Sequence, residues 1–143
     1  MKKSILFLLL LTGIIFGACS TSKNTNSNDL FNTTWELDFI TGSRIAFDGL
    51  YPNEKPTLIF DEETNRVHGN NSCNGYSYKF TLAKEKLTFS EPGPATLRYC
   101  EGNGDKAFLQ MIEKVESFSI DENKNLNLIA NGIPAMRFKK VSN

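Results

Sequence analysis

The sequence has no excess of basic charge and very little histidine. Its 143 residues include 16 basic side chains, 16 acidic side chains and a single histidine, His68. A nucleic-acid-binding domain carries a basic patch, so the balanced charge argues against a nucleic-acid partner. Tetrahedral zinc sites use four Cys or His ligands, and a serine or cysteine nucleophile needs a base within reach. We therefore expect no catalytic residue, no metal and no cofactor, and we interpret His68 as a surface or strand-edge residue.

No apolar run is long enough to span a bilayer. The longest covers residues 5–16 and is interrupted by Thr12 and Gly13. At about 1.5 Å per helical residue it would reach roughly 18 Å, against a hydrocarbon core of about 30 Å. Two lysines precede this run and Gly-Ala-Cys follows it, which is the layout of a bacterial lipoprotein signal peptide. We expect residues 1–18 to be removed and Cys19 to carry lipid; a plain secreted protein and a retained anchor are the alternatives.

The segment that follows Cys19 lacks apolar side chains. Residues 20–29 read STSKNTNSND, a composition that cannot bury enough surface to become ordered. Residues 19–29 are therefore predicted to be a flexible, lipid-anchored tether. Removal of Lys2 and Lys3 leaves 14 of the 16 basic residues, against 16 acidic ones. Because no acidic run suggests export to the cell surface, we expect a monomeric outer-membrane lipoprotein that faces the periplasm.

From residue 30 onward, apolar side chains recur at every second position, which indicates half-buried strands. Dense turn sequences separate these segments, so the strands are short and antiparallel. The pattern predicts a mainly β domain over residues 30–143, a small antiparallel β-barrel-like or half-open barrel fold. The expected strands cover residues 34–39, 57–60, 75–82, 86–90, 117–120, 126–130 and 135–140. The residues expected to face inward on the two clearest strands are Trp35, Leu37, Phe39, Tyr76, Tyr78, Phe80 and Leu82.

One segment, residues 104–117, departs from this period. Its apolar residues Phe108, Met111, Ile112 and Val115 recur at helical spacing, and Asp105 is placed to cap the first turn. We expect one α-helix of about three turns, packed on the sheet with its apolar face in the core.

Three sequence elements, in order, resemble the META domain, the HslJ-like family of bacterial envelope proteins. They are Trp35 on the first strand, Ser-Cys-Asn-Gly-Tyr at residues 72–76, and Thr-Leu-Arg-Tyr-Cys at residues 96–100 before the helix. Ser72 stands where this family usually has glycine, a residue that tolerates positive φ as serine does not. The family-motif residues carried over to this sequence are Trp35, Asn74, Tyr76 and Thr96.

The resemblance implies a small antiparallel β-barrel-like fold with one helix and a location in the cell envelope. It also implies an association with stress or drug tolerance, as in some relatives, and no established enzymatic activity. Pilot lipoproteins of secretion systems have related folds and use an apolar cleft to chaperone a partner, but this comparison is one of fold alone.

The three cysteines leave an even pair once Cys19 carries lipid. In an oxidising compartment, Cys73 and Cys100 are then expected to form a disulfide. Two free thiols, or a redox or metal role, are the alternatives. A copper(I) site can be drawn from both cysteines, His68 and one methionine, Met111 or Met136, but a disulfide would abolish it.

The interpretation that unites these features is a lipid-anchored envelope protein that acts by binding and not by catalysis. Its partners would be the membrane, through Cys19, and an envelope protein or apolar ligand that the sequence does not identify. The aromatic side chains on the inward faces are expected to fill the core. If they instead line a slot, the protein is an apolar-ligand-binding barrel or a secretion-pilot-like chaperone, and an enzyme or metal carrier is the third class.

Overall fold

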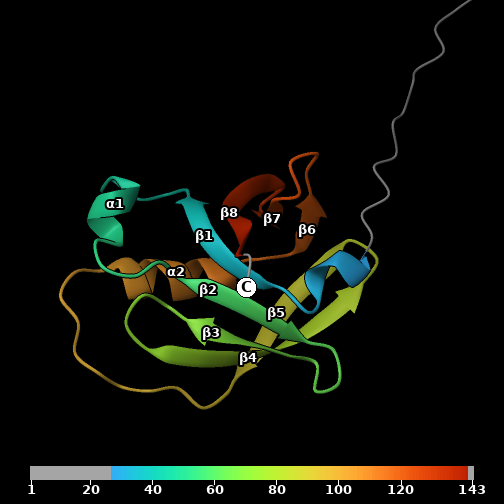
Figure 1. Ribbon diagram of the computed structural model, residues 1–143, viewed down its shortest axis with the longest axis horizontal. Coiled ribbons are helices and arrows are strands. Elements are labelled where there is room, and N and C mark those ends of the chain that lie inside the picture. The colour runs from blue at the N-terminus through green and yellow to red at the C-terminus, as the bar shows by residue number, and fades with distance from the viewer. Residues whose placement is uncertain (1–26, 142–143) are drawn as a thin grey trace, which may run out of the picture.

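The computed structural model describes residues 27–141, in which eight strands form one ring-like antiparallel sheet (Figure 1). The predicted signal peptide, 1–18, and residues 19–26 of the predicted tether lie outside this range. Residues 27–29 of that tether belong to a short 3-10 helix, η1 (Ser27–Leu30). The strands are β1 (Thr34–Ile40), β2 (Thr57–Asp61), β3 (Arg66–Asn70), β4 (Gly75–Ala83), β5 (Lys86–Pro92), β6 (Ser117–Ile120), β7 (Leu126–Ala130) and β8 (Ile133–Val141). The helices are α1 (Phe47–Leu50) and α2 (Gly104–Ile112).

Every strand pairs with the next along the chain, and β8 returns to pair with β1, which closes the ring. The closure begins at the pair Thr34 and Val141 and continues along both strands. The weakest link joins β5 and β6 through one residue pair, Lys86 with Ser117. The prediction of a mainly β, barrel-like fold with one α-helix packed on it is confirmed, α1 being a single turn.

The inward side chains fill the ring with aromatic and aliphatic groups. Trp35 on β1 is fully buried and donates its indole N–H to the carbonyl oxygen of Leu30 at 3.0 Å. Phe108 on α2 packs edge-on against Tyr76 and Phe138, with ring centroids 5.4 Å and 6.4 Å away. The helix is therefore part of the core, as its apolar periodicity predicts. Aromatic pairs of this geometry add about 0.5–1.5 kcal/mol beyond their buried area.

The prediction that Phe39 faces inward is wrong. Leu37 pairs with Phe138 on β8 while Phe39 pairs with Arg137, so Asp38 is the extra residue of a β-bulge. Beyond the bulge the alternation shifts by one position, which leaves Phe39 44% exposed beside the Arg137 guanidinium and turns Ile40 into the core.

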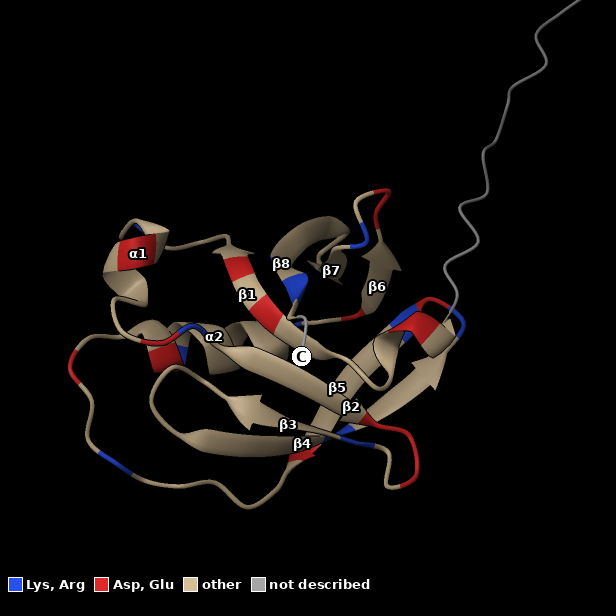
Figure 2. Ribbon diagram, viewed as in Figure 1, with Lys and Arg blue, Asp and Glu red and all other residues tan. Residues whose placement is uncertain are grey.

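The bulge residue Asp38 forms an ion cluster with β8. Its carboxylate accepts hydrogen bonds from Arg137 at 2.9 Å and 3.1 Å and lies 3.0 Å from the Lys139 ammonium. Figure 2 shows the acidic positions of β1 beside a basic position of β8. Burial raises the pKa of this carboxyl, but the hydrogen bonds and positive charges of Arg137 and Lys139 outweigh burial and hold the pKa below its ordinary value.

The substitution Asp38→Asn is expected to lower the free energy of unfolding by about 1–2 kcal/mol at pH 7, because it removes charge-assisted hydrogen bonds. A carboxyl whose pKa is lowered by folding stabilises the protein above its unfolded pKa of about 4, and this contribution is lost as pH falls through the folded value. Urea unfolding of both proteins should therefore show a difference that shrinks toward pH 2. Glu36→Gln is the control on the same strand, since Glu36 and Lys55 lie 3.8 Å apart and are both 43% exposed. A pH-independent difference for Asp38→Asn would contradict the ion-cluster interpretation.

The helix α2 is shorter than predicted and starts differently. It covers Gly104–Ile112 and its N-cap is Asn103, so Asp105 is not the cap. A glycine is needed at position 104 because a Cβ there would collide with the carbonyl oxygen of Leu50, and the Tyr51 hydroxyl donates to the Gly104 carbonyl at 3.1 Å. Val115 lies beyond the helix end and is still buried. None of the helices in residues 27–141 is long and apolar enough to cross a membrane.

Candidate functional site

The turn between β3 and β4 is built by a buried asparagine. The side-chain oxygen of Asn71 accepts the backbone N–H groups of Cys73 at 3.1 Å and Asn74 at 2.7 Å. The Asn71 N–H donates to the Asn74 carbonyl at 2.9 Å. Asparagine favours such turns because its side chain can replace a backbone hydrogen-bond partner. The turn thereby fixes the direction in which Cys73 and Asn74 point.

Ser72, at the centre of this turn, adopts φ +83°. That value lies in the left-handed region, where a side chain costs about 1–2 kcal/mol and glycine almost nothing. The backbone has therefore kept the conformation that glycine allows, although the residue is serine.

The substitution Ser72→Gly is expected to raise the free energy of unfolding by about 0.5–1 kcal/mol, since the relieved strain exceeds the added flexibility of the unfolded chain. Ser90→Gly on β5, an exposed position outside the positive-φ residues, is the matched control and should destabilise by about 0.5–1 kcal/mol. Both are measured by urea unfolding. Equal effects of the two substitutions would show that the turn is not strained.

Asn74 uses its side-chain amide as a backbone unit would in a β-ladder. Its Oδ1 accepts the Arg98 N–H at 2.7 Å and the Thr96 hydroxyl at 2.9 Å, while its Nδ2 donates to the Arg98 carbonyl at 3.1 Å. The residue is only 7% exposed. A neutral amide is suited to this place because it offers both an acceptor and a donor on one rigid plane.

Thr96 and Arg98 belong to residues 93–100, a segment that we call the 93–100 loop. Further hydrogen bonds hold this loop. Thr96 and Gly75 exchange two hydrogen bonds of 3.0 Å, one through the backbone and one through the threonine hydroxyl. Arg98 donates from its guanidinium to the Cys73 carbonyl oxygen. Cys73 and Cys100 form a disulfide with Cα atoms 6.1 Å apart, which confirms the predicted pair and removes the thiols that a copper site would need. The 93–100 loop is thus fixed along the start of β4.

The other two family-motif residues serve the core. Tyr76 is buried and donates its hydroxyl to the Thr57 carbonyl at 2.7 Å. Burial, and then the neighbouring Tyr78, raise the pKa of Tyr76 well above its ordinary value, so this hydroxyl stays protonated. Trp35 lies inside the ring. The structure therefore brings Asn74 and Thr96 together with the disulfide, and gives Trp35 and Tyr76 separate structural contacts.

The 93–100 loop presents two apolar side chains to solvent. Leu97 is 96% exposed and Tyr99 is 93% exposed. They alternate with Thr96 and Arg98, whose hydrogen bonds point toward Asn74 and Cys73, so the loop is held by one side and displays the other. In Figure 1 this connection between β5 and α2 runs along the lower left, outside the strands. Neither exposed residue was predicted from the sequence, although the alternation in Thr-Leu-Arg-Tyr was a signal of an extended segment.

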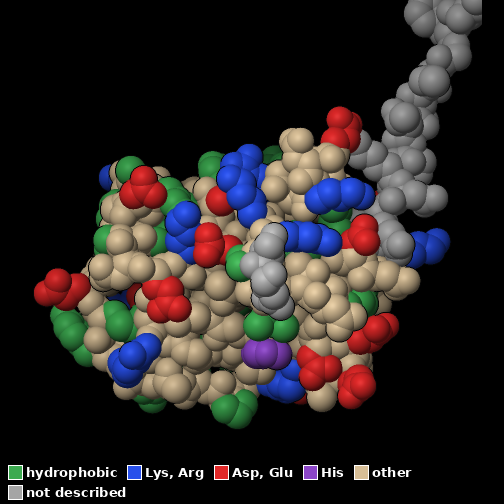
Figure 3. All heavy atoms as spheres, viewed as in Figure 1, with side chains coloured by type: hydrophobic (Ala, Val, Ile, Leu, Met, Phe, Trp, Pro, Cys, Tyr) green, Lys and Arg blue, Asp and Glu red, His purple; other side chains and the backbone are tan. Residues whose placement is uncertain are grey.

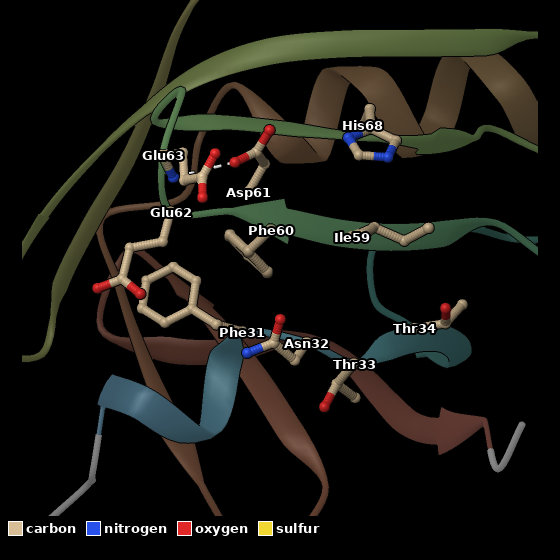
Figure 4. A pocket seen from close by; sticks show the side chains of 10 residues that line it. All are labelled: Phe31, Asn32, Thr33, Thr34, Ile59, Phe60, Asp61, Glu62, Glu63 and His68. Atoms are coloured by element: carbon tan, nitrogen blue, oxygen red, sulfur yellow. Dashed lines mark hydrogen bonds between the residues drawn. The ribbon is translucent and has the colours of Figure 1, made fainter.

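The second candidate site is a groove between the start of β1 and strands β2 and β3 (Figure 4). It is an open groove of about 670 Å³. His68 lines it and is exposed, on the outer face of β3, as Figure 3 also shows. The Asp61 carboxylate is engaged by the backbone N–H groups of Glu63 and Thr64 at 3.0 Å and 3.2 Å. The residues that line the groove are Phe31, Asn32, Thr33, Thr34, Ile59, Phe60, Asp61, Glu62, Glu63 and His68.

Hydrogen bonds to Thr64 lower the pKa of Asp61 more than any other contact, and the charge of His68 adds a smaller contribution. Asp61 is therefore a turn acceptor and not a paired acid–base group. Across residues 27–141, no three His, Cys, Asp or Glu side chains are arranged to hold a metal ion. Of the loop and the groove, the 93–100 loop is the stronger candidate for function. Its backbone is fixed, and its exposed apolar side chains do not pack in the core.

The ring-like sheet and its disulfide-fixed loop define a small antiparallel β-domain with one helix. The META domain family model matches residues 28–142, and the chain belongs to this family. Among solved structures, the chain is similar to one described as the NMR structure of the protein from Burkholderia xenovorans. The TM-score is 0.62 at 19% identity, over 80% of this chain and 85% of that one, which supports the fold. A comparison with curated proteins finds no match.

Proposed function

We propose that this META-domain chain is a lipid-anchored protein of the outer membrane, facing the periplasm, that acts by binding through the 93–100 loop. The observation that carries the proposal is the near-complete exposure of Leu97 and Tyr99 on a loop fixed by a disulfide and by Asn74. Large apolar side chains gathered at an exposed site mark interaction surfaces, and tyrosine is common among the residues that dominate binding energy.

The fixed backbone of the 93–100 loop favours binding for a second reason. A flexible loop loses conformational entropy when it binds, at about 0.5–1.5 kcal/mol for each immobilised side chain and more for the backbone. Here the disulfide and the Asn74 contacts have already ordered the backbone during folding. Leu97 and Tyr99 then lose only side-chain freedom when they are covered.

The binding role can be tested by complementation. In a strain that lacks this protein, the variant Leu97→Ser/Tyr99→Ser should fail to restore tolerance to an envelope-directed drug, while its protein level equals that of the wild type. Ile133→Ser removes another exposed apolar side chain, 58% exposed, and should restore tolerance fully. Full complementation by the loop variant would exclude the 93–100 loop as the working surface.

The lipid anchor is tested separately. We expect Cys19→Ser to abolish incorporation of labelled palmitate and to release the protein from the membrane fraction. Several acyl chains on one cysteine give stable anchoring, since burial stabilises by about 0.8 kcal/mol for each CH₂. Cys73→Ala, which alters the folded domain and not the proposed lipid site, should leave labelling unchanged. Undiminished labelling of the Cys19 variant would refute the anchor.

The apolar-ligand-binding and secretion-pilot-like alternatives require a hollow interior. In this ring, the largest fully buried side chains include Trp35, Phe108, Phe118 and Phe138, which occupy the centre. The groove of Figure 4 is open and its lining is mostly polar. No specific contact favours either alternative, so we retain a single proposed function.

A further inference from the structure

We propose that the surface which Leu97 and Tyr99 contact is the phospholipid bilayer itself, so that the 93–100 loop is a second, non-covalent membrane contact. This inference rests on the proposed function and names the partner of the same site. The exposure of the two side chains is the first argument. An aliphatic side chain gains free energy on leaving water, and tyrosine prefers the boundary between headgroups and hydrocarbon.

The charge of the 93–100 loop fits the same partner. Residues 92–100 contain one charged side chain, Arg98, and no acidic one. Figure 2 shows this basic position on the loop, with the next acidic position beyond it toward α2. Glu91, which precedes the loop, lies 3.5 Å from the Lys79 ammonium. Arg98 stands between the two apolar residues in the sequence, and anionic phospholipid headgroups attract Lys and Arg near the surface by about 1 kcal/mol each.

Arg98 can serve both the loop and a phosphate. The hydrogen bond to the Cys73 carbonyl uses one N–H of its guanidinium, and arginine has five N–H donors. The residue is exposed, so the remaining donors can reach a headgroup while the first one continues to hold the loop. A lysine at this position would not form both contacts in the same way, because its ammonium lacks the planar, fixed arrangement of donors of the guanidinium.

The length of chain between Cys19 and the described domain supplies the third argument. Eight residue steps separate Cys19 from Ser27, which at about 3.3–3.6 Å each gives a maximum span of about 29 Å. A domain held this close to a bilayer meets it at an effective concentration in the millimolar range. Ser27 lies beside Lys79 and Leu82, late in β4, whereas the 93–100 loop runs along the start of β4, so the loop meets the bilayer when β4 lies along the membrane surface (Figure 1). In that orientation two side chains that would bind free vesicles weakly are sufficient, because the contact is intramolecular.

The test holds the domain at a bilayer through a histidine tag that replaces the proposed lipid anchor at Cys19. A chain from Ser20 to Asn143, which keeps every described residue, carries an N-terminal histidine tag and is bound to vesicles of phosphatidylethanolamine, phosphatidylglycerol and a nickel-chelating lipid. Tyr99→Trp reports on the loop and Ile133→Trp is the control. The emission of the native, buried Trp35 is subtracted using the unsubstituted chain, and formation of the disulfide is verified first.

We expect phospholipids brominated on their acyl chains to quench the added tryptophan of the Tyr99→Trp chain at least about twofold. The added tryptophan of the Ile133→Trp chain should keep its emission. Introducing Leu97→Ser into the Tyr99→Trp chain should weaken the quenching. Replacing phosphatidylglycerol by phosphatidylcholine should also weaken it, because the anionic headgroups that attract Arg98 are then absent. Absent quenching, or equal quenching at both positions, would overturn the membrane contact. If quenching is absent and the loop variant still fails to complement, the partner is a protein and the proposed function stands.

Discussion

Replacing both Cys73 and Cys100 by alanine is expected to lower the free energy of unfolding by roughly 3.6 kcal/mol. The two residues are 27 positions apart, and the chain-entropy model gives this value for a loop of that size. The free energy of unfolding of a native protein is about 5–15 kcal/mol, so this loss would be a large fraction of the total stability. Guanidinium unfolding of the oxidised wild type and of the double variant measures it.

Chemical reduction supplies the control for this prediction. A dithiol reductant should bring the wild type close to the double variant in stability and should leave the double variant unchanged. If reduction and double substitution each change the stability by less than about 1 kcal/mol, the disulfide does not hold the 93–100 loop in the way described.

The substitution Asn74→Ala is expected to lower the free energy of unfolding by about 3 kcal/mol. The substitution leaves the N–H and the carbonyl of Arg98, together with the Thr96 hydroxyl, without the partners they have in the structure. A polar group that loses its partner in a shielded site costs about 1–3 kcal/mol. Because Thr96 is exposed, water can replace its bond, and the two backbone groups of Arg98 dominate the loss. Urea unfolding gives the value.

Asn70→Ala is the matched control for Asn74. Asn70 lies in the same region, but its side-chain amide donates only to the exposed Glu54 carboxylate, and its Oδ1 has no hydrogen-bond partner. We expect a change below about 1 kcal/mol. Asn74→Asp should also destabilise, because a carboxylate oxygen would face the Arg98 carbonyl oxygen in place of the donor. An Asn74→Ala effect no larger than that of Asn70→Ala would contradict the role of the amide.

The disulfide and Asn74 act on the same loop, so their effects should not add. Once the disulfide is absent, part of the order that Asn74 maintains is already lost, and Asn74→Ala should cost less in that background. Residues that share a network show interaction energies of about 0.5–3 kcal/mol in double-mutant cycles. Simple additivity would mean that the two restraints hold independent parts of the chain.

The period-two pattern was sufficient to predict most strands because each contributes several buried side chains. Strand β3 was missed for a physical reason: Val67 is its one buried apolar residue, so the segment shows no alternation of apolar side chains. The bulge at Asp38 was also hidden, since it depends on the partner strand β8 and not on the local sequence. Phe39 was placed on the wrong face as a result.

The candidate site was half predictable. The pairing of Cys73 and Cys100 followed from counting cysteines in an oxidising compartment, and Asn74 and Thr96 from the family resemblance. That the Asn74 amide bonds to Arg98, 24 residues away in the chain, depends on how the 93–100 loop returns along β4. Exposure of Leu97 and Tyr99 follows from the same path, which no local pattern reveals.

The closing pair of strands, β1 and β8, has a consequence for how the chain is made. All other pairings join strands adjacent in sequence, whereas Thr34 meets Val141 near the end of the described chain. During synthesis, β1 therefore keeps one edge without its final partner until β8 has emerged, and pairings so distant in sequence are slow to form. An unpaired edge is a template for aggregation. The nascent domain would gain from a holding factor that covers β1 until the last strand arrives.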